Sequence, residues 1–308
     1  MSRRPTVSVI IAAYKAPEYL NQAIESVAAQ TFNDYEIIVV DDGSGEEYTS
    51  QYRLPENATL ICHPHNVGAV AATRNTGIRV SRGKYLAFLD QDDIWVPEKL
   101  AVQVKAFEDN PGAGLVYSHY KAVDERLNPV GGETKRRSSL RDPLKKLSRG
   151  CIIRSPSCVM IPRRVIDECG MFDESIPGAS DWELYWRIAS RYSFVVSPDQ
   201  LTLYRMHSDQ LHKRKPYMHA AKLLMMDKAL KWSQSERPDM LKCVRHNYGR
   251  VLRQLAIAKL EDDPAGAVEI MRHSIAMWPY NIRHYLYLAR IIHVYRKKNR
   301  TPSNQTAG

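Results

Sequence analysis

Residues Val7–Tyr14 read VSVIIAAY, and the apolar, β-branched run Val7–Ala13 within them predicts a buried strand. A helical pattern follows over Pro17–Gln30, and a second apolar run, EIIVV, occupies Glu36–Val40. Further strands and helices are expected in alternation at Ala58–Cys62, Val70–Val80, Tyr85–Leu89 and Pro97–Glu108. Strands that alternate with helices are typical of βαβ units, so this part of the chain predicts a Rossmann-like, mainly parallel sheet flanked by helices.

The remaining chain changes character twice. Residues 124–150 are basic, contain Gly and Ser and have no clear period, which predicts a mobile loop. A strand is then expected at Cys158–Ile161, a helix at Asp181–Arg191 and a short strand at Thr202–Arg205. Later patterns are all helical, at Tyr217–Ser233, Asp239–Leu260, Ala265–Met277 and Asn281–Arg296. We therefore expect an α/β domain over residues 1–212, a helical C-terminal region over 213–298 and a disordered tail over 299–308.

Composition and charge narrow the class of protein. The 308 residues are 44% hydrophobic and 25% charged, which is typical of a folded chain. The five cysteines show no C-x-x-C spacing, which argues against a zinc ribbon or a disulfide framework and for a reducing, cytoplasmic setting. The longest apolar run, Val9–Ala13, is far shorter than a membrane span requires.

The positive charge lies in the second part of the chain. Residues 1–120 hold 10 Lys and Arg against 15 Asp and Glu, whereas residues 121–308 hold 34 against 19. Two interpretations stay open for the basic segment Ile282–Lys298 (IRHYLYLARIIHVYRKK). In one, Ile282, Leu286, Ala289 and Ile292 face an anionic membrane surface, which would make the protein peripheral on the inner face of the membrane. In the other, the segment is an ordinary packed helix with a basic outer face. We expect no nucleic-acid partner.

Carboxylates follow two of the predicted strands at the point where each ends. Asp41 and Asp42 come after the second strand, and Asp90, Asp92 and Asp93 come after the fourth. Because the carboxyl ends of parallel strands meet at one edge of a sheet, these five side chains are expected to converge. A divalent cation such as Mg²⁺ or Mn²⁺ would relieve their repulsion, and Mg²⁺ commonly takes its other ligands from phosphates. The pattern therefore indicates a nucleoside diphosphate site, although aspartates at strand ends can also simply cap helices and turns.

An ordered set of short segments resembles the family 2 glycosyltransferases, which have the GT-A fold. The segments are VSVIIAAY (7–14), SVAAQT (26–31), EIIVVDDGS (36–44), HNVGAVAATRNTGI (65–78), GKYLAFLDQDD (83–93), SDWEL (180–184) and YRMH (204–207). The resemblance implies an inverting transfer of a single sugar, with a UDP-sugar as the expected donor. The acceptor would be a hydroxyl of a glycan or of a lipid-linked molecule in cell-surface polysaccharide synthesis.

The resemblance also implies a role for each site residue. Tyr14 would stack on the nucleotide base, Asp41 would accept a hydrogen bond from that base, and Asp181 would be the catalytic base. Arg74 would contact the diphosphate or the base, Asp90 would face the ribose, and Asp92 would bind a divalent metal, Mg²⁺ or Mn²⁺, with His207 near it. The full set of residues expected to bind the nucleotide sugar is Ala12, Tyr14, Asp41, Asp42, Arg74, Asp90 and Gln91. Lys15 departs from the family, in which Asn is more usual.

Most of these residues have a plain structural alternative. Tyr14 could pack at a strand end, Arg74 could pair with a structural Asp, and Asp181 could cap its helix. Asp42 could only shape a turn, and His207 could be structural. Trp182, Tyr185 and Trp186 are expected in the core or in the wall of an acceptor pocket.

Three other functions fit the sequence less well. A nucleotidyltransferase should carry a Gly-rich phosphate loop after the first strand, where Ala12 and Ala13 stand instead. A processive synthase should carry a Gln-x-x-Arg-Trp motif and membrane spans, and the sequence shows neither feature. A non-catalytic sugar-nucleotide-binding scaffold on the same fold remains the alternative, because fold alone does not establish function.

Overall fold

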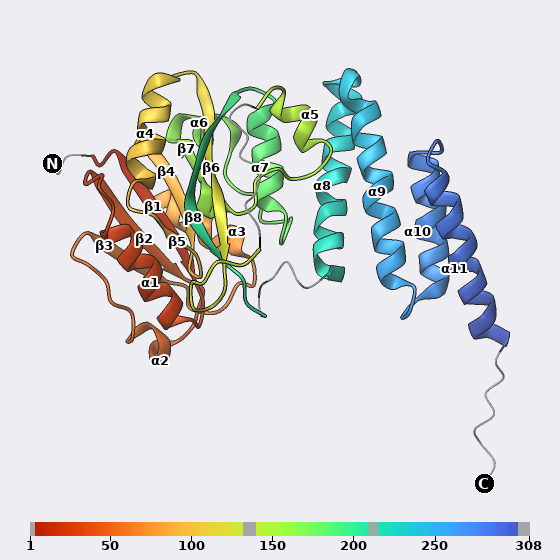
Figure 1. Ribbon diagram of the computed structural model, residues 1–308, viewed down its shortest axis with the longest axis horizontal. Helices are drawn as coiled ribbons and strands as arrows, with labels where there is room; N and C mark the ends of the chain where they lie inside the picture. The colour runs from red at the N-terminus through yellow and green to blue at the C-terminus, as the bar shows by residue number, and fades with distance from the viewer. Residues whose placement is uncertain (1–3, 132–139, 209, 211–214, 301–308) are drawn as a thin grey trace, which may run out of the picture. The chain divides into compact units, whose positions relative to one another are not determined.

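The computed structural model describes residues 4–131, 140–208, 210 and 215–300 (Figure 1). The chain divides into two compact units. The first, which we call the sheet unit, comprises residues 1–147 and 151–210, and the second, the helical unit, comprises residues 148–150 and 211–308. Among the described residues, no helix has both the length and the apolar character needed to cross a membrane.

One mixed sheet forms the centre of the sheet unit. The strand order is β3-β2-β1-β4-β7-β6-β8-β5. In the described residues, β7 and β5 run against the other six strands, so the sheet is mainly parallel, as expected. The strands are β1 Val7–Ala13, β2 Tyr35–Asp41, β3 Ala58–Cys62, β4 Tyr85–Asp90, β5 Ile94–Trp95, β6 Ala113–Val123, β7 Val159–Pro162 and β8 Ser193–Arg205.

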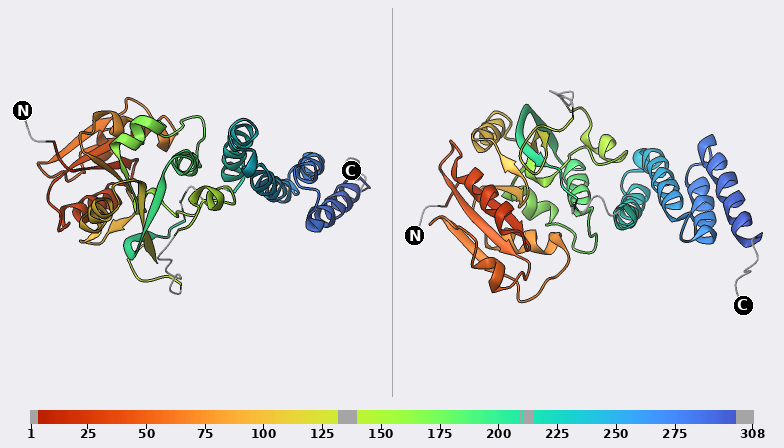
Figure 2. Two further views of the ribbon diagram at one scale, coloured as in Figure 1. Left: turned by 90° about the horizontal axis from the view of Figure 1, so that it is seen from above. Right: turned by 60° about the horizontal axis from the view of Figure 1, so that its bottom comes forward.

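Helices cover both faces of this sheet (Figures 1 and 2). They are α1 Pro17–Ala28, α2 Glu46–Thr49, α3 Val70–Val80, α4 Lys99–Asp109, α5 Pro143–Leu147, α6 Arg163–Cys169 and α7 Ser180–Ala189. On one face, Val9 and Ile11 of β1 share a core with apolar side chains of α1 and α4. On the other face α3 lies against β1, and a Cβ at Gly77 would come within 2.5 Å of Ile10. Since β1 is buried from both sides, its unbroken apolar sequence is explained.

The least expected part of the sheet is the pair β6 and β8. Neither Ala113–Val123 nor the first part of Ser193–Arg205 was predicted, yet these two strands pair in parallel along most of their length. Polar residues interrupt both sequences, and the pairing shifts register near Ser118 and His119. Strands of this kind gain their burial from each other and from β7, so their own hydrophobic pattern is weak. The loop expected over 124–150 is also partly wrong, because α5 lies within it, while residues 132–139 fall outside the described residues.

Four helices make up the helical unit and follow one another as antiparallel neighbours (Figure 2). They are α8 Lys215–Ser235, α9 Leu241–Lys259, α10 Pro264–Met277 and α11 Ile282–Arg300. Met271 of α10 and Ile291 of α11 are fully buried in a small core with Ala256 and Ala267. The four helical patterns are thus confirmed. However, α11 continues to Arg300, so residues 299 and 300 belong to this helix and not to the predicted tail; residues 301–308 fall outside the description.

Candidate active site at the carboxyl ends of the strands

The ends of β2, β1 and β4 lie side by side and bring the predicted residues together. Asp41 pairs with Ala13 across β2 and β1, and Asp90 pairs with Ala12 across β4 and β1. The two groups of carboxylates therefore stand at one edge of the sheet, as the parallel topology required.

A side-chain amide holds Tyr14 at this edge. The Gln91 side chain accepts a hydrogen bond from the Tyr14 backbone N–H at 2.8 Å and donates one to its carbonyl at 3.1 Å. The Tyr14 ring is 39% exposed, so it is not packed in the core. Lys15 follows with a left-handed φ of 47°, a conformation that Asn adopts more readily than Lys. Its ammonium lies 5.3 Å from the Tyr14 ring centroid.

Asp41 and Asp42 are both buried and both hydrogen-bonded. Asp41 accepts from the Ser44 backbone N–H at 2.7 Å, from the Ser44 hydroxyl at 2.6 Å and from the Tyr52 hydroxyl at 2.6 Å. Asp42 lies 2.9 Å from His63 Nδ1 and accepts from the backbone N–H of Val67 at 3.1 Å. Each carboxylate therefore holds the loops around the turn at Gly43. A nucleotide base that donates a hydrogen bond to Asp41 would share this carboxylate with Ser44 and Tyr52.

Arg74 and Asp90 form a partly buried ion pair at this edge. Arg74 Nη2 donates to Asp90 Oδ1 at 2.5 Å. The other oxygen of Asp90 accepts from the Ser155 hydroxyl at 3.1 Å. Burial alone would lower the pKa of Arg74, but the Asp90 carboxylate outweighs it and the pKa is raised. Arg74 does pair with an aspartate, and that partner is itself one of the predicted site residues.

Asp92 and His207 come together although 115 positions separate them in sequence. Asp92 Oδ2 lies 2.9 Å from His207 Nε2, and both side chains keep partial exposure. The neighbouring Asp93 is fully buried and accepts from the Arg205 backbone N–H and the Ser155 hydroxyl, each at 3.1 Å. Burial, together with the charges of Asp92 and Asp90, raises the pKa of Asp93 well above its usual range.

The side chains at this edge suit a cation that takes most of its ligands from water or from a bound phosphate. In the part of the chain that the structure describes, no three His, Cys, Asp or Glu side chains form a closed metal-binding cluster. Asp92 and His207 are the adjacent, partly exposed pair that could bind a divalent ion. Mg²⁺ and related ions commonly take their remaining ligands from water and phosphate, so two protein ligands fit such an ion.

Asp181 lies in the first turn of α7, where its carboxylate accepts a hydrogen bond from the backbone N–H of Trp182. The N-cap position belongs to Ala179, and no side chain caps the helix there. Burial raises the pKa of Asp181, while the charge of Arg74 opposes the rise. Asp181 therefore does not occupy the N-cap position, although its carboxylate is hydrogen-bonded to the backbone of the first turn. A carboxylate with a raised pKa beside a buried arginine has the properties of a proton acceptor.

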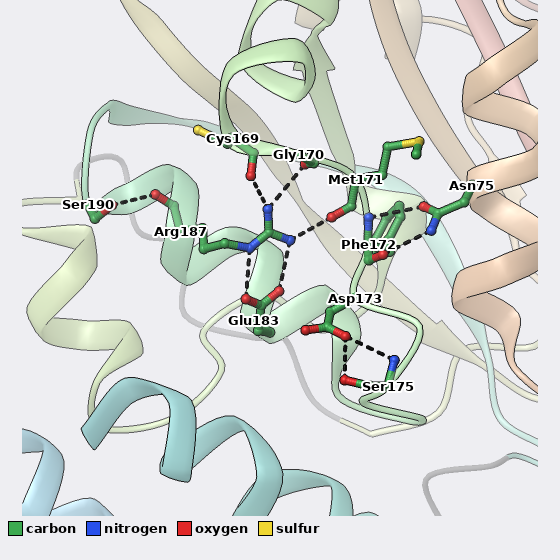
Figure 3. A network of polar contacts seen from close by, with 10 residues as sticks. All are labelled: Asn75, Cys169, Gly170, Met171, Phe172, Asp173, Ser175, Glu183, Arg187 and Ser190. Atoms are coloured by element: carbon green, nitrogen blue, oxygen red, sulfur yellow. Dashed lines mark hydrogen bonds and ion pairs between the residues drawn. The ribbon is translucent and has the colours of Figure 1, made fainter. Parts of the chain in front are cut away.

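A polar network fixes α7 against the loop that precedes it (Figure 3). Arg187 donates to both carboxylate oxygens of Glu183, at 2.7 and 2.8 Å, and to the Met171 carbonyl at 2.6 Å. The Asn75 side chain of α3 donates a hydrogen bond to the Phe172 carbonyl in the same loop and accepts one from the Phe172 backbone N–H. The helix of Asp181 and the helix of Arg74 are thus tied to one loop, which holds the two side chains in a constant relation. Glu183 serves this network.

Ser155 was not predicted from the sequence to belong to the site, and Tyr185 was predicted only to pack. Ser155 hydrogen-bonds both Asp90 and Asp93, but nothing in the segment Arg154–Cys158 marks it in the sequence. Tyr185 was expected in the core or in the wall of an acceptor pocket. Its side chain is fully buried, yet its hydroxyl has no hydrogen-bond partner among the described residues, although Asp181 and Arg74 are among the charges that act on it. A buried hydroxyl without a partner costs free energy and is available to a ligand.

The unpartnered hydroxyl of Tyr185 leads to a stability prediction. Tyr185→Phe should raise the free energy of unfolding by about 1 kcal/mol, because it removes a buried polar group that is not satisfied. Tyr52→Phe is the matched control in the same unit, since it deletes a hydrogen bond to the Asp41 carboxylate and should lower stability by about 1.5–3 kcal/mol. Urea unfolding followed by fluorescence measures both. Equal destabilisation by the two changes would show that the Tyr185 hydroxyl has a structural partner.

Comparison with known proteins agrees with this geometry. The sequence model of the family "Glycosyl transferase family 2" matches residues 8–170. A protein of Rickettsia bellii described as an uncharacterized glycosyltransferase is 30% identical over 220 residues, which cover 68% of this chain and 31% of that protein. The chain thus spans about a third of that relative's length.

A functionally named relative and a solved structure extend the comparison. The Escherichia coli UDP-Glc:alpha-D-GlcNAc-diphosphoundecaprenol beta-1,3-glucosyltransferase WfaP is 34% identical over 115 residues, or 37% of this chain and 45% of that protein. The mannosyltransferase PcManGT of Pyrobaculum calidifontis, solved with GDP-Man and Mn²⁺, superposes with a TM-score of 0.60 at 17% identity, covering 96% of this chain and 86% of that one. The expected GT-A fold is confirmed. With the family pattern matched over more than half of its residues, the chain belongs to glycosyl transferase family 2.

Proposed function

We propose that the protein is an inverting glycosyltransferase that moves one sugar from a nucleoside diphosphate donor to an acceptor hydroxyl. The observation that carries this proposal is the placement of Asp181, whose pKa burial raises, within electrostatic reach of the partly buried Arg74–Asp90 pair at the sheet edge. The same edge presents the exposed aromatic ring of Tyr14, on which a nucleotide base could stack. Binding groups for a nucleotide and a proton acceptor thus stand together.

Each residue has one task in the proposed reaction. Tyr14 stacks on the base and Asp41 accepts a hydrogen bond from it, while Asp90 faces the ribose. Asp181 takes the proton from the acceptor hydroxyl as this oxygen attacks the anomeric carbon from the face opposite the diphosphate. The bond to the diphosphate breaks as the new glycosidic bond forms, and a single displacement inverts the anomeric configuration. No carboxylate nucleophile is needed.

The negative charge of the leaving diphosphate must be offset. Arg74 supplies one positive charge close to Asp90. Asp92 and His207 would hold the divalent metal, Mg²⁺ or Mn²⁺. When bound, such an ion acts as a Lewis acid toward the phosphate oxygens. The Mn²⁺ in the PcManGT complex and the donor set described above support this assignment.

The donor and acceptor are proposed from the relatives. WfaP uses UDP-glucose and an acceptor linked to diphosphoundecaprenol, which supports a UDP-sugar and a lipid-linked or glycan acceptor in cell-surface polysaccharide synthesis. The protein would then work in the cytoplasm at the inner face of the membrane. The unpartnered Tyr185 hydroxyl would hydrogen-bond a hydroxyl of the donor sugar or the acceptor.

A screen of donors tests this function. The full-length chain is incubated with UDP-, GDP- and dTDP-sugars in the presence of Mn²⁺, of Mg²⁺ or of a chelator, and the released nucleoside diphosphate is measured. We expect slow hydrolysis of one class of donor, with the UDP-sugars favoured, and loss of this activity in chelator. Binding of a nucleotide sugar without any release would favour the non-catalytic scaffold. The absence of any binding would overturn the proposal.

A further inference from the structure

A pocket lined by arginines lies in the helical unit. It has a volume of about 400 Å³, and Arg253 of α9 lines it together with Arg283, Leu286, Tyr287 and Arg290 of α11. None of its side chains belongs to the site at the sheet edge. The pocket is open to solvent and combines three guanidinium groups with apolar and aromatic surface.

The three arginines of this pocket have no carboxylate partner among the described residues. Arg253 Nη1 is buried and has no hydrogen-bond acceptor in the described part of the chain, and the guanidinium lies 5.9 Å from the Tyr287 ring centroid. Burial lowers the pKa of Arg253, and the positive charges of Arg283 and Arg250 lower it further. Like charges held together without a counter-ion raise the free energy of the folded chain, and a bound anion would remove this cost.

Acidic residues are scarce around the pocket. Residues 211–308 hold 19 Lys and Arg against seven Asp and Glu, and the sequence of α11, Ile282–Arg300, contains no acidic residue. The field at this surface therefore favours an anionic partner.

Apolar side chains stand next to the arginines and point outward. Ile282 is 69% exposed, Leu286 is 64% exposed, and Ala289 is also exposed. The side of α11 that packs against the rest of the helical unit carries His284 and Ile291, both fully buried. The helix thus packs on α9 and α10 through other residues, and Ile282, Leu286 and Ala289 remain on its exposed side. Tyr280, just before the helix, is 83% exposed.

We propose that this pocket binds the phosphate of an anionic phospholipid and thereby docks the helical unit on a membrane surface. Guanidinium groups bind phosphate oxygens with paired hydrogen bonds, which suits three unpaired arginines around one cavity. Exposed aliphatic and aromatic side chains beside them would enter the boundary between head groups and acyl chains. A phosphate in free solution would satisfy the arginines but would leave Ile282, Leu286 and Tyr280 exposed. This docking does not depend on the proposed transfer reaction.

Vesicle sedimentation of the full-length chain tests the proposal. The wild type should pellet with phosphatidylglycerol-containing vesicles and stay in the supernatant with phosphatidylcholine vesicles. The double variant Arg283→Gln with Arg290→Gln should bind about thirtyfold more weakly, since each basic residue at an anionic surface contributes roughly fivefold. Both arginines are exposed, so the variant is expected to fold normally. Leu286→Ser should also weaken binding while leaving the net charge unchanged.

The control double variant separates the pocket from general charge attraction. Lys242→Gln with Arg272→Gln removes the same two positive charges from exposed positions of α9 and α10 outside the pocket, and it should bind within about twofold of wild type. An equal loss of vesicle binding in the two double variants would overturn the proposal. Wild-type protein that binds neither kind of vesicle would also overturn it. Calorimetry with inorganic phosphate provides a further arm. Phosphate binding at the pocket without vesicle binding would assign the site to a soluble anion and overturn the membrane assignment.

Discussion

Asp181→Asn should lower the turnover number for sugar transfer by about 10²–10⁴-fold, because an amide cannot accept the proton of the acceptor hydroxyl. The dissociation constant of the nucleoside diphosphate should change little, since the proposed contacts to the base and the diphosphate come from other residues. Steady-state transfer kinetics and calorimetric titration of the nucleotide measure the two quantities. Unchanged turnover in this variant would exclude Asp181 as the base.

The pH profile adds a second readout for Asp181. Burial raises its pKa, so the wild-type turnover should fall on the acid side at a higher pH than an ordinary aspartate would give. This acid limb should be absent from the residual activity of Asp181→Asn. An acid whose pKa is raised by folding stabilises the fold while it is protonated, and this contribution is lost as the pH rises through the folded pKa. At neutral pH the variant should therefore unfold at the same temperature as wild type or a higher one.

Glu183→Gln is the matched control on the same helix. Glu183 accepts two hydrogen bonds from Arg187 in the network of Figure 3, so this change should lower the unfolding temperature. Its folded protein should keep the wild-type pH profile, because Glu183 is held by Arg187 and is buried. A loss of the acid limb in this variant would move the proton acceptor from Asp181 to Glu183.

Asp92→Asn should reduce transfer by about 100-fold or more and should weaken the dependence of nucleotide binding on Mn²⁺ or Mg²⁺. A bound divalent ion contributes several kcal/mol to the stabilisation of charge on a leaving phosphate, and each 1.4 kcal/mol is a factor of ten. The amide keeps the shape of the side chain and can still hydrogen-bond His207. Calorimetric titration of the nucleoside diphosphate at several metal concentrations measures the effect.

Asp93→Asn controls for a general loss of charge at this edge. Asp93 is fully buried and bound to Ser155 and to the Arg205 backbone, so the variant should be less stable but should keep its metal dependence. If Asp92→Asn binds nucleotide with the wild-type metal dependence, the metal does not use Asp92. If Asp93→Asn alone loses the dependence, the ligand lies one residue further along the chain.

The bounds of three elements of the sheet unit could be predicted from the sequence to the residue. The bounds of β1, Val7–Ala13, of β3, Ala58–Cys62, and of α3, Val70–Val80, are those expected. In each, the β-rich run or the helical period is local information, because it lies within the residues of the element itself. The convergence of the carboxylates at the sheet edge followed from the parallel order of β2, β1 and β4.

The pairing of β6 with β8 was decided by tertiary structure. Tyr117 meets Val196, and Tyr120 meets Thr202, across segments about 80 residues apart in sequence. Pro198 and Asp199 interrupt the pattern of β8, and the strand forms because β6 supplies hydrogen bonds and burial to it. Such stabilisation depends on the neighbour, so no window of the sequence contains it.

The sequence alone therefore determined the family, the parallel part of the sheet, the four C-terminal helices and the set of acidic residues at the sheet edge. Only the tertiary structure decided which partners those residues have. Asp41 is held by Tyr52, Asp90 by Arg74 and Ser155, and Asp92 by His207. Among the described residues, the tertiary structure also left the Tyr185 hydroxyl and Arg253 Nη1 without hydrogen-bond partners. The reason is physical: residue type sets what a side chain can bind, but burial and the neighbours brought from distant segments set what it does bind.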